Sequence, residues 1–165
     1  MGKKIEETPS RMIGERAPAF ALPDQDGIVH KQSDYKGRHV VLYWYPKDDT
    51  PGCTAESCGF RDNLTEYGKL NTAVLGISML NPKSKAKFAA KHSLTFPLLS
   101  DEDSAVATAY GVWVQKSMYG KTYMGISRET FVIGPDGEIA AHWPKAKGSE
   151  GHAAEVLEWL RAAKS

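Results

Sequence analysis

Both cysteines of this chain fall within one short segment, Thr50-Pro-Gly-Cys53-Thr-Ala-Glu-Ser-Cys58. Thiolates are strong nucleophiles and oxidise reversibly, so two thiols this close together point to redox chemistry. Thr50-Pro51 predicts the start of a helix, because a Thr hydroxyl can accept an unpaired amide and Pro at the first helical position loses no hydrogen bond. Cys53 then lies in the first helical turn, where free amides and the positive end of the helix dipole favour a thiolate.

Placement at a helix terminus does not by itself explain fast thiol chemistry. A free cysteine with a pKa of about 8.5 is only ~3% ionised at pH 7, so complete ionisation raises the thiolate concentration at most roughly 30-fold. Fast reaction also needs hydrogen-bond donors aimed at charge that appears in the transition state. Thr50 and the amides of the first turn are local candidates, and we expect a cation to come from elsewhere in the chain.

The spacing of the two cysteines constrains how they could bond. On one helix, Cα atoms five residues apart are about 8.6 Å apart and their side chains diverge by roughly 140°. A disulfide tolerates at most ~7 Å. If Cys53 and Cys58 bond, the helix must first unwind, which would make the disulfide part of a reaction cycle. Two inert buried thiols, or an ordinary bridge in a loop, are the alternatives, although inert thiols would not need Thr-Pro-Gly before the first. The pair also makes a poor zinc site and is not the Cys-x-x-Cys of a thioredoxin-like reductase.

The residues around Cys53 resemble a known family. Pro46-x-x-x-Thr50-x-x-Cys53 resembles the active-site signature of the peroxiredoxins. Thr50-Pro-Gly-Cys-Thr-x-Glu-x-Cys58 further resembles the Q-type subfamily, also called bacterioferritin comigratory proteins. The likeness runs from about Ala17 to Leu160 and includes Phe96-Pro-Leu-Leu-Ser-Asp, Tyr110-Gly-Val-Trp and Arg128-Glu-Thr-Phe-Val-Ile. A minor departure is Met79-Leu80-Asn81-Pro82, where relatives often carry an Asp-Ser pair.

This resemblance implies a role for each matching residue. Cys53 would be the peroxidatic cysteine, which reduces hydrogen peroxide and organic hydroperoxides and becomes a sulfenic acid. Cys58 would be the resolving cysteine, which forms a disulfide with it. Thr50 would hydrogen-bond the peroxide, Arg128 would supply the cation, and Pro46 would shield the site from water. Thioredoxin or glutaredoxin would reduce the disulfide, and no metal or organic cofactor is implied. A resolving cysteine in the same helix favours a monomer.

Two other functions use the same thiol pair. In a redox-sensing interaction protein, the switch would alter a binding surface and consume one equivalent of peroxide per chain. A general thiol-disulfide reductase would act on disulfide substrates without peroxide.

Composition agrees with a single compact enzyme domain. The chain has 165 residues and a formal net charge of +1, which gives no reason to expect a nucleic-acid or acidic-membrane partner. No apolar run approaches the ~20 residues of a membrane span, and the N-terminus lacks an apolar signal region. We therefore expect a cytoplasmic protein with a flexible polar arm over residues 1–16 and one domain over residues 17–165.

The pattern of elements predicts a thioredoxin-like α/β fold, with a central mixed sheet flanked by helices and an extra N-terminal β-hairpin. The site would lie at the carboxyl end of a sheet strand. The hairpin is expected at 19–22 and 28–31. Further strands are expected at 39–45, 73–78, 96–99, 129–133 and 138–143, and helices at 51–70, 82–92, 104–110 and about 150–163.

Other polar and aromatic residues have ordinary structural interpretations. Glu56 could brace an arginine, or simply complement the helix dipole. Arg61 and Asp62 could be a surface charge pair. The histidines lack metal-binding spacing and are expected at the surface or in strands: His30, His39, His92, His142 and His152. The residues expected first of all in the core are Tyr43, Trp44, Tyr45 and Trp113.

Overall fold

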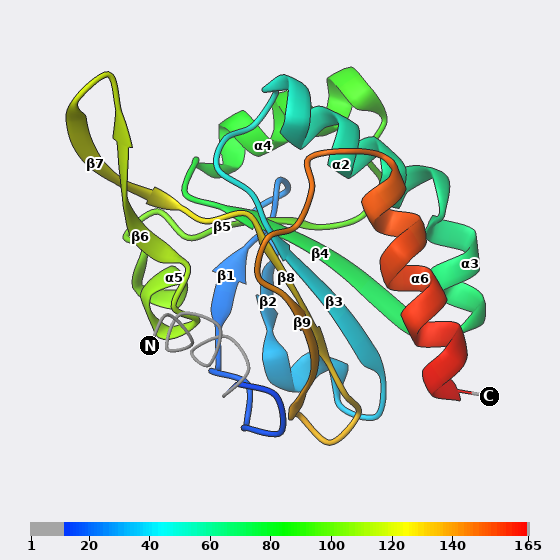
Figure 1. Cartoon of the computed structure of the whole chain (residues 1–165). Helices are drawn as coiled ribbons and strands as arrows, with labels where there is room; N and C mark the ends of the chain where they lie inside the picture. The colour runs from blue at the N-terminus through cyan, green and yellow to red at the C-terminus, as the bar shows by residue number, and fades with distance from the viewer. Residues whose placement is uncertain (1–11, 165) are drawn as a thin grey trace.

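The computed structural model describes residues 12–164, and these form a five-stranded mixed sheet with helices on both faces (Figure 1). The strand order is β5-β4-β3-β8-β9. β3, β4 and β5 run parallel to one another, whereas β8 is antiparallel to β3 and β9 is antiparallel to β8. The bounds are β3 (His39–Trp44), β4 (Thr72–Ser78), β5 (Leu98–Ser100), β8 (Glu129–Ile133) and β9 (Ile139–Trp143). The expected central mixed sheet is confirmed.

Alternating side chains of β3 divide the core into two layers, because successive residues of a strand point to opposite faces. Val41 and Tyr43 pack with helices α2, α3, α4 and α6, whereas Leu42 and Trp44 pack with α5 and the N-terminal segment. The helices are α2 (Pro51–Asp62), α3 (Leu64–Lys69), α4 (Pro82–His92), α5 (Ala105–Ala109) and α6 (Gly151–Lys164). Tyr43, Trp44 and Tyr45 have no exposed surface, as predicted, while Trp113 is half-buried at the edge of the second layer.

Parallel pairing of β3 and β4 places the segments that follow them at one edge of the sheet. The segment after β3 leads into α2, and the segment after β4 leads into α4. These two helices lie together at the top of Figure 1. Asn81 caps α4 as the sequence predicts, accepting a 2.9 Å hydrogen bond from the amide of Ser84, with Pro82 next. This edge therefore positions both α2 and α4.

The predicted N-terminal hairpin is present as β1 (Ala21–Pro23) and β2 (Val29–Lys31), followed by the short 3₁₀ helix η1 (Gln32–Tyr35). The hairpin of β6 (Trp113–Met118) and β7 (Lys121–Ile126) was not predicted, and it projects from the body of the molecule (Figure 1). Tyr119 and Gly120, at its turn, both have positive φ, as a tight two-residue hairpin turn requires.

Two further expectations need correction. The helix predicted over 51–70 is divided at Asn63, whose side-chain amide donates to the carbonyl of Gly59 at 2.8 Å and so satisfies an acceptor at the end of α2. Residues 12–16, expected in a loose arm, are joined to the β8–β9 turn. The amide of Gly14 donates to the Ile139 carbonyl, and the Ile139 amide donates to Glu15. The rest of that arm, residues 1–11, lies outside the described residues.

Candidate active site

Cys53 lies in the first turn of α2, as the Thr-Pro-Gly sequence predicts. Its side chain has no exposed surface, and Cys58 is only 8% exposed. Both thiols are free, and α2 is continuous across them. The structure therefore represents the reduced state, with the two cysteines held apart on an intact helix.

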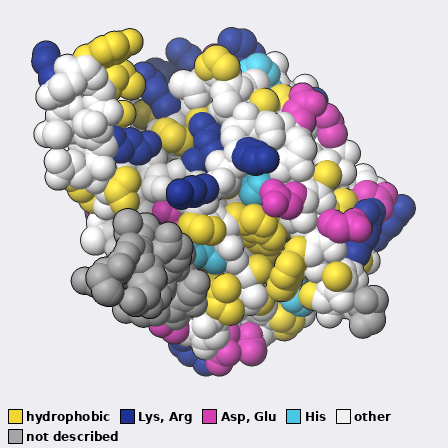
Figure 2. Space-filling view, viewed as in Figure 1, with side chains coloured by type: hydrophobic (Ala, Val, Ile, Leu, Met, Phe, Trp, Pro, Cys, Tyr) yellow, Lys and Arg dark blue, Asp and Glu magenta, His cyan; other side chains and the backbone are white. Residues whose placement is uncertain are grey.

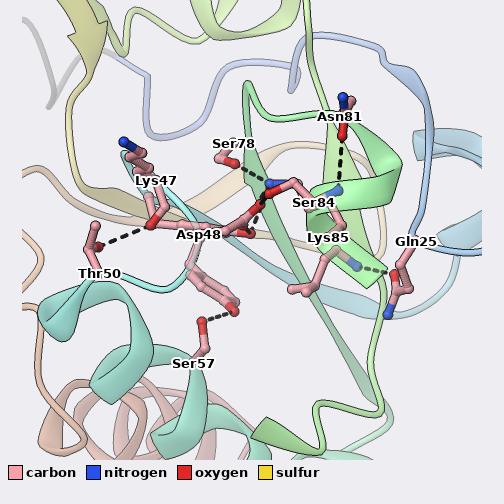
Figure 3. Close-up of polar contacts among 12 residues, drawn as sticks. Gln25, Lys47, Asp48, Thr50, Ser57, Ser78, Asn81, Ser84 and Lys85 are labelled. Atoms are coloured by element: carbon pink, nitrogen blue, oxygen red, sulfur yellow. Dashed lines mark hydrogen bonds and ion pairs between the residues drawn. The ribbon is translucent and has the colours of Figure 1, made fainter. Parts of the chain in front are cut away.

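Thr50 occupies the cap position of α2 in an extended conformation, but its hydroxyl does not cap the helix. It donates instead to the carbonyl of Lys47 at 3.0 Å (Figure 3). The prediction that this hydroxyl accepts an orphan amide is therefore wrong. Because the hydroxyl proton is already committed, the oxygen presents its lone pairs to any donor that enters the site. A hydroperoxide O–H is such a donor.

Arg128, which lies between β7 and β8, comes to the first turn of α2 from far along the chain. Burial opposes its charge, but the neighbouring Cys53 and Glu56 favour that charge, and the net result is a raised pKa of the guanidinium. Cys53 is therefore an electrostatic neighbour of the guanidinium. The structure thus brings Cys53 together with the cation expected from elsewhere in the sequence.

Two glycines make room for the Arg128 side chain. A Cβ atom on Gly52 would lie 3.1 Å from Nη2 of Arg128, and one on Gly148 would lie 3.1 Å from Cζ. The Gly148 Cβ would also lie only 3.0 Å from the Cα of Gly52. The guanidinium therefore lies close to the backbone of both glycines, which limits its movement beside Cys53.

Glu56 braces Arg128 from within the core. Nη1 of Arg128 donates to Oε1 of Glu56 at 2.8 Å, and the carboxyl group has no exposed surface. Burial raises the pKa of Glu56 to about 7, although the charge of Arg128 acts in the opposite direction. Oε2 has no hydrogen-bond partner among residues 12–164, and Nε2 of His152 lies 4.0 Å from it. Glu56 therefore does brace an arginine, in addition to any interaction with the helix dipole.

His152 is itself fully buried in α6, so the expectation of a surface or strand histidine is wrong for this residue. Its Nε2 shares a 2.8 Å hydrogen bond with the hydroxyl of Thr130, and its Nδ1 lies 3.2 Å from Glu155. Burial is the main reason that the pKa of His152 is lowered. A neutral imidazole therefore faces the unpaired oxygen of Glu56.

The carboxyl end of β3 is joined to α2 by a side-chain hydrogen bond. Pro46 directly follows β3 and Tyr45, and it is half-buried. The Tyr43 hydroxyl shares a 2.8 Å hydrogen bond with Ser57 of α2 (Figure 3). In this way β3 is joined to the helix that carries both cysteines.

The second half of α2 is tightly packed. The ring of Phe60 stacks on Tyr43 with centroids 4.6 Å apart. A Cβ on Gly59 would lie 2.6 Å from the carbonyl oxygen of Glu150, so the backbones of α2 and the segment before α6 touch closely. Arg61 pairs with the exposed Asp62, as predicted, and also donates to the His92 carbonyl at 2.7 Å. Unwinding α2 would disrupt these contacts.

Sequence reasoning missed a buried cluster beside this site, centred on Asp48 and Lys85. A signal was present, because residues 85, 88 and 89 share one face of α4 and Phe88 and Ala89 are apolar. Residue 85 should therefore face the core.

Within residues 12–164, no group of His, Cys, Asp and Glu side chains could hold a metal ion. In that same range no helix is long and apolar enough to cross a membrane.

The sequence matches a known family model over most of its length. Residues 13–142 match the model described as "AhpC/TSA family". Peroxiredoxin Bcp of Escherichia coli is 48% identical over 148 residues, which cover 90% of this chain and 94% of that protein. Peroxiredoxin Bcp of Bacillus subtilis is 44% identical over 149 residues, with the same coverage of 90% and 94%.

Solved structures agree with the fold. The Xanthomonas campestris bacterioferritin comigratory protein, studied for its alkyl peroxide reduction activity, superposes with a TM-score of 0.84 and 37% identity. That match covers 95% of this chain and 96% of the other. BcpB of Mycobacterium tuberculosis has a TM-score of 0.82 and 36% identity, covering 93% and 99%. These similarities confirm the thioredoxin-like α/β fold and the resemblance seen in the sequence.

Proposed function

Because the chain belongs to the AhpC/TSA family, among its Q-type peroxiredoxins, and is a thiol-dependent peroxidase, we propose that Cys53 is its peroxidatic cysteine. The observation that supports this assignment is the position of the Cys53 side chain at the start of α2, beside Arg128. Cys58 lies further along the helix, without that cation beside it among the contacts described above. Of the two thiols, Cys53 therefore has the environment that a reactive thiolate needs.

The first chemical step is attack of the Cys53 thiolate on one peroxide oxygen. The S–O bond forms from the sulfur lone pair as the O–O bond breaks. The leaving oxygen takes a proton and departs as water or an alcohol, and the sulfur becomes a sulfenic acid. Arg128 stabilises the charge that moves from sulfur to the leaving oxygen, because its planar guanidinium can donate to both.

Thr50 and Pro46 complete the peroxide pocket in this proposal. The Thr50 oxygen accepts the hydroperoxide proton, and its orientation is set by the hydrogen bond to Lys47. Pro46 adds apolar surface at the end of β3 and limits the access of water to the sulfur. Holding the peroxide and the Cys53 thiolate in the reactive geometry can contribute a large share of the rate acceleration.

The second step forms the Cys53–Cys58 disulfide. The Cys58 thiolate attacks the sulfenic sulfur, and the hydroxyl leaves as water. Since an intact α2 keeps the two Cα atoms about 8.6 Å apart, the helix must unwind between them. The buried Phe60 and Glu56 then leave their sites, so this step rearranges part of the core.

We assign thioredoxin or glutaredoxin as the reductant, since a dithiol protein can reduce an exposed disulfide by exchange. Hydrogen peroxide and alkyl hydroperoxides are the proposed substrates, by analogy with the activity described for the Xanthomonas relative. A cytoplasmic monomer agrees with thiols that must be reduced after every turnover and with a resolving cysteine on the same helix.

The proposal is tested by peroxide turnover with each reductant. Catalytic consumption of hydrogen peroxide and of a small alkyl hydroperoxide is expected with thioredoxin, glutaredoxin or both. Consumption of only one equivalent per chain would indicate a redox sensor. Reduction of a disulfide substrate without peroxide would indicate a general reductase.

A further inference from the structure

Lys85 is a buried lysine in an electrostatically unfavourable position. It lies in the first turn of α4, and its side chain has no exposed surface. The positive end of a helix dipole disfavours a cation there, and removal of an ammonium from water costs several kcal/mol unless it is paired. A lysine at this position therefore requires compensating partners.

All three ammonium hydrogens of Lys85 have an acceptor. Nζ donates to Oδ1 of Asp48 at 3.0 Å, to the Tyr45 hydroxyl at 3.0 Å and to the hydroxyl of Ser78 (Figure 3). These acceptors come from the ends of β3 and β4 and from the loop before α2. Lys85 thus joins three segments at the edge of the sheet that carries the candidate site.

Both carboxylate oxygens of Asp48 are also used. Oδ1 accepts a second hydrogen bond from the Tyr45 hydroxyl at 2.5 Å, and Oδ2 accepts from the Ser84 hydroxyl at 2.7 Å. Tyr45 belongs to the strand end, whereas Ser84 and Lys85 belong to α4. Asp48 is therefore fixed between β3 and α4, two residues before Thr50.

The neighbouring Asp49 shows that this loop needs such support. Its φ of 63° lies in the left-handed region, which is unfavourable for a non-glycine residue although Asp tolerates it better than most. Its carboxylate pairs with Lys91 and His92, but the Lys91 side chain is 61% exposed, and exposed pairs contribute little. The buried Asp48–Lys85 pair is the stronger of the two attachments to α4.

We propose that Lys85 is a positioning residue: through Asp48 it holds the loop of residues 45–50 so that Thr50 and the first turn of α2 face the peroxide. The inference rests on the assignment of Cys53 and Thr50 proposed above. It makes α4 part of the active site, although none of the motif residues belongs to that helix. The loop geometry in question includes the Lys47 carbonyl that orients the Thr50 hydroxyl.

A direct effect of the ammonium on the thiolate is the competing explanation. Burial lowers the pKa of Lys85 to about 8, and both Asp48 and Cys53 act to raise it, so Lys85 and Cys53 do interact electrostatically. Asp48→Asn does not separate the two, because loss of the Asp48 charge lowers the pKa of Lys85 further and removes the lysine charge as well. The pH profile of Lys85→Met does separate them. If Lys85 acts through its own field, the variant loses only thiolate, so its rate reaches that of the wild type at high pH, where the thiol is fully ionised. If Lys85 acts by position, Lys85→Met stays slower at every pH.

The experiment is a double-mutant cycle of Asp48→Asn and Lys85→Met, with Lys87→Met as the control. Lys87 is an exposed lysine on the same helix. The rate of Cys53 oxidation by hydrogen peroxide is measured by stopped flow as a function of pH, and amide exchange is measured over residues 46–53. We expect each single variant to react about tenfold more slowly or worse, with faster exchange in the loop. The double variant should be no slower than the worse single, because both residues act as one unit.

The double variant also serves as a control in case Lys85→Met alone fails to fold. Lys85→Met alone leaves a buried carboxylate unpaired, which can be strongly destabilising, whereas removal of both charges is often tolerated. A folded double variant that oxidises as fast as the Lys87→Met control would overturn the inference, and so would recovery of the wild-type rate by Lys85→Met at high pH. If the wild-type Cys53 itself reacts no faster than free cysteine, the site assignment fails and this inference fails with it.

Discussion

Arg128 and Glu56 form an ion pair in which the acid is completely buried and the base lies beside Cys53. The 2.8 Å contact between Nη1 and Oε1 uses one carboxylate oxygen, and the other oxygen has no hydrogen-bond partner within residues 12–164. Glu56 lies between the two cysteines on α2. Any unwinding of α2 that lets the cysteines bond therefore also separates Glu56 from Arg128.

Substitution of Arg128 tests its role as the cation of the site. Arg128→Lys keeps the charge but loses the planar set of donors, so peroxide attack should slow by about tenfold or more. Arg128→Ala should slow it further. Stopped-flow oxidation of Cys53 measures both rates, with Arg161→Lys on the exposed face of α6 as the control. Unchanged second-order rates in both variants would show that Arg128 has no role in the reaction with peroxide.

Gly148→Ala should displace the same guanidinium without touching its charge. The added methyl group would lie 3.1 Å from Cζ of Arg128 and 3.0 Å from the Cα of Gly52, so the side chain or the loop must move. We expect about a tenfold slower peroxide reaction, because a small misplacement in an active site is costly. Gly68→Ala, where the methyl group meets open space, is the matched control. Equal rates in the two variants would show that the plane of Arg128 is not important.

Glu56 should make stability depend on pH in a definite direction. Its pKa of about 7 in the folded chain exceeds the ordinary value of 4.5, so the folded state binds more protons between these values. The free energy of unfolding contributed by this group therefore falls as pH rises from 4.5 to 7. The change amounts to on the order of 3 kcal/mol.

Denaturant titrations of wild type and Glu56→Gln across this range measure the effect. The variant should lose this part of the slope, whereas Glu158→Gln, at an exposed position of α6, should keep it. A wild-type stability that rises steadily through the interval, with the same slope in Glu56→Gln, would contradict the burial argument.

Oxidation should melt a limited part of α2. Amides of residues 54–61 should be protected from hydrogen exchange in the reduced chain and exchange faster in the oxidised chain, while α6 stays protected as an internal reference. The packing of Phe60 on Tyr43 should be lost at the same time. Equal protection of residues 54–61 in both states would mean that Cys53 and Cys58 do not bond.

Local signals in the sequence predicted the centre of the site well. Thr50-Pro51 correctly marks the start of α2, and Asn81-Pro82 correctly marks the start of α4. Helix starts depend on a few neighbouring residues, so they can be recognised without knowledge of the fold. The contact of Arg128 with Cys53 could be anticipated only from the family resemblance, because it joins residues distant in the chain.

Features that depend on tertiary contacts were missed. The position of Lys85 on the same helix face as Phe88 and Ala89 indicates burial, but the partner that makes its burial possible, Asp48, can be identified only from the fold. The β6–β7 hairpin turns at Tyr119, which has a φ of 53°, an uncommon conformation for an aromatic residue and hence a weak turn signal. The break at Asn63 likewise depends on the bond from its side chain to the carbonyl of Gly59.

The central claim is that Cys53 is the residue that peroxide oxidises first, and trapping of the sulfenic acid tests it most directly. Cys58→Ser is treated with one equivalent of hydrogen peroxide and a dimedone-type probe, and the labelled residue is identified by mass spectrometry. We predict stoichiometric label on Cys53 in this variant, a Cys53–Cys58 disulfide in the wild type, and no peroxide reduction by Cys53→Ser. Label on Cys58 in the wild type, together with continued turnover by Cys53→Ser, would contradict the account and reverse the two roles.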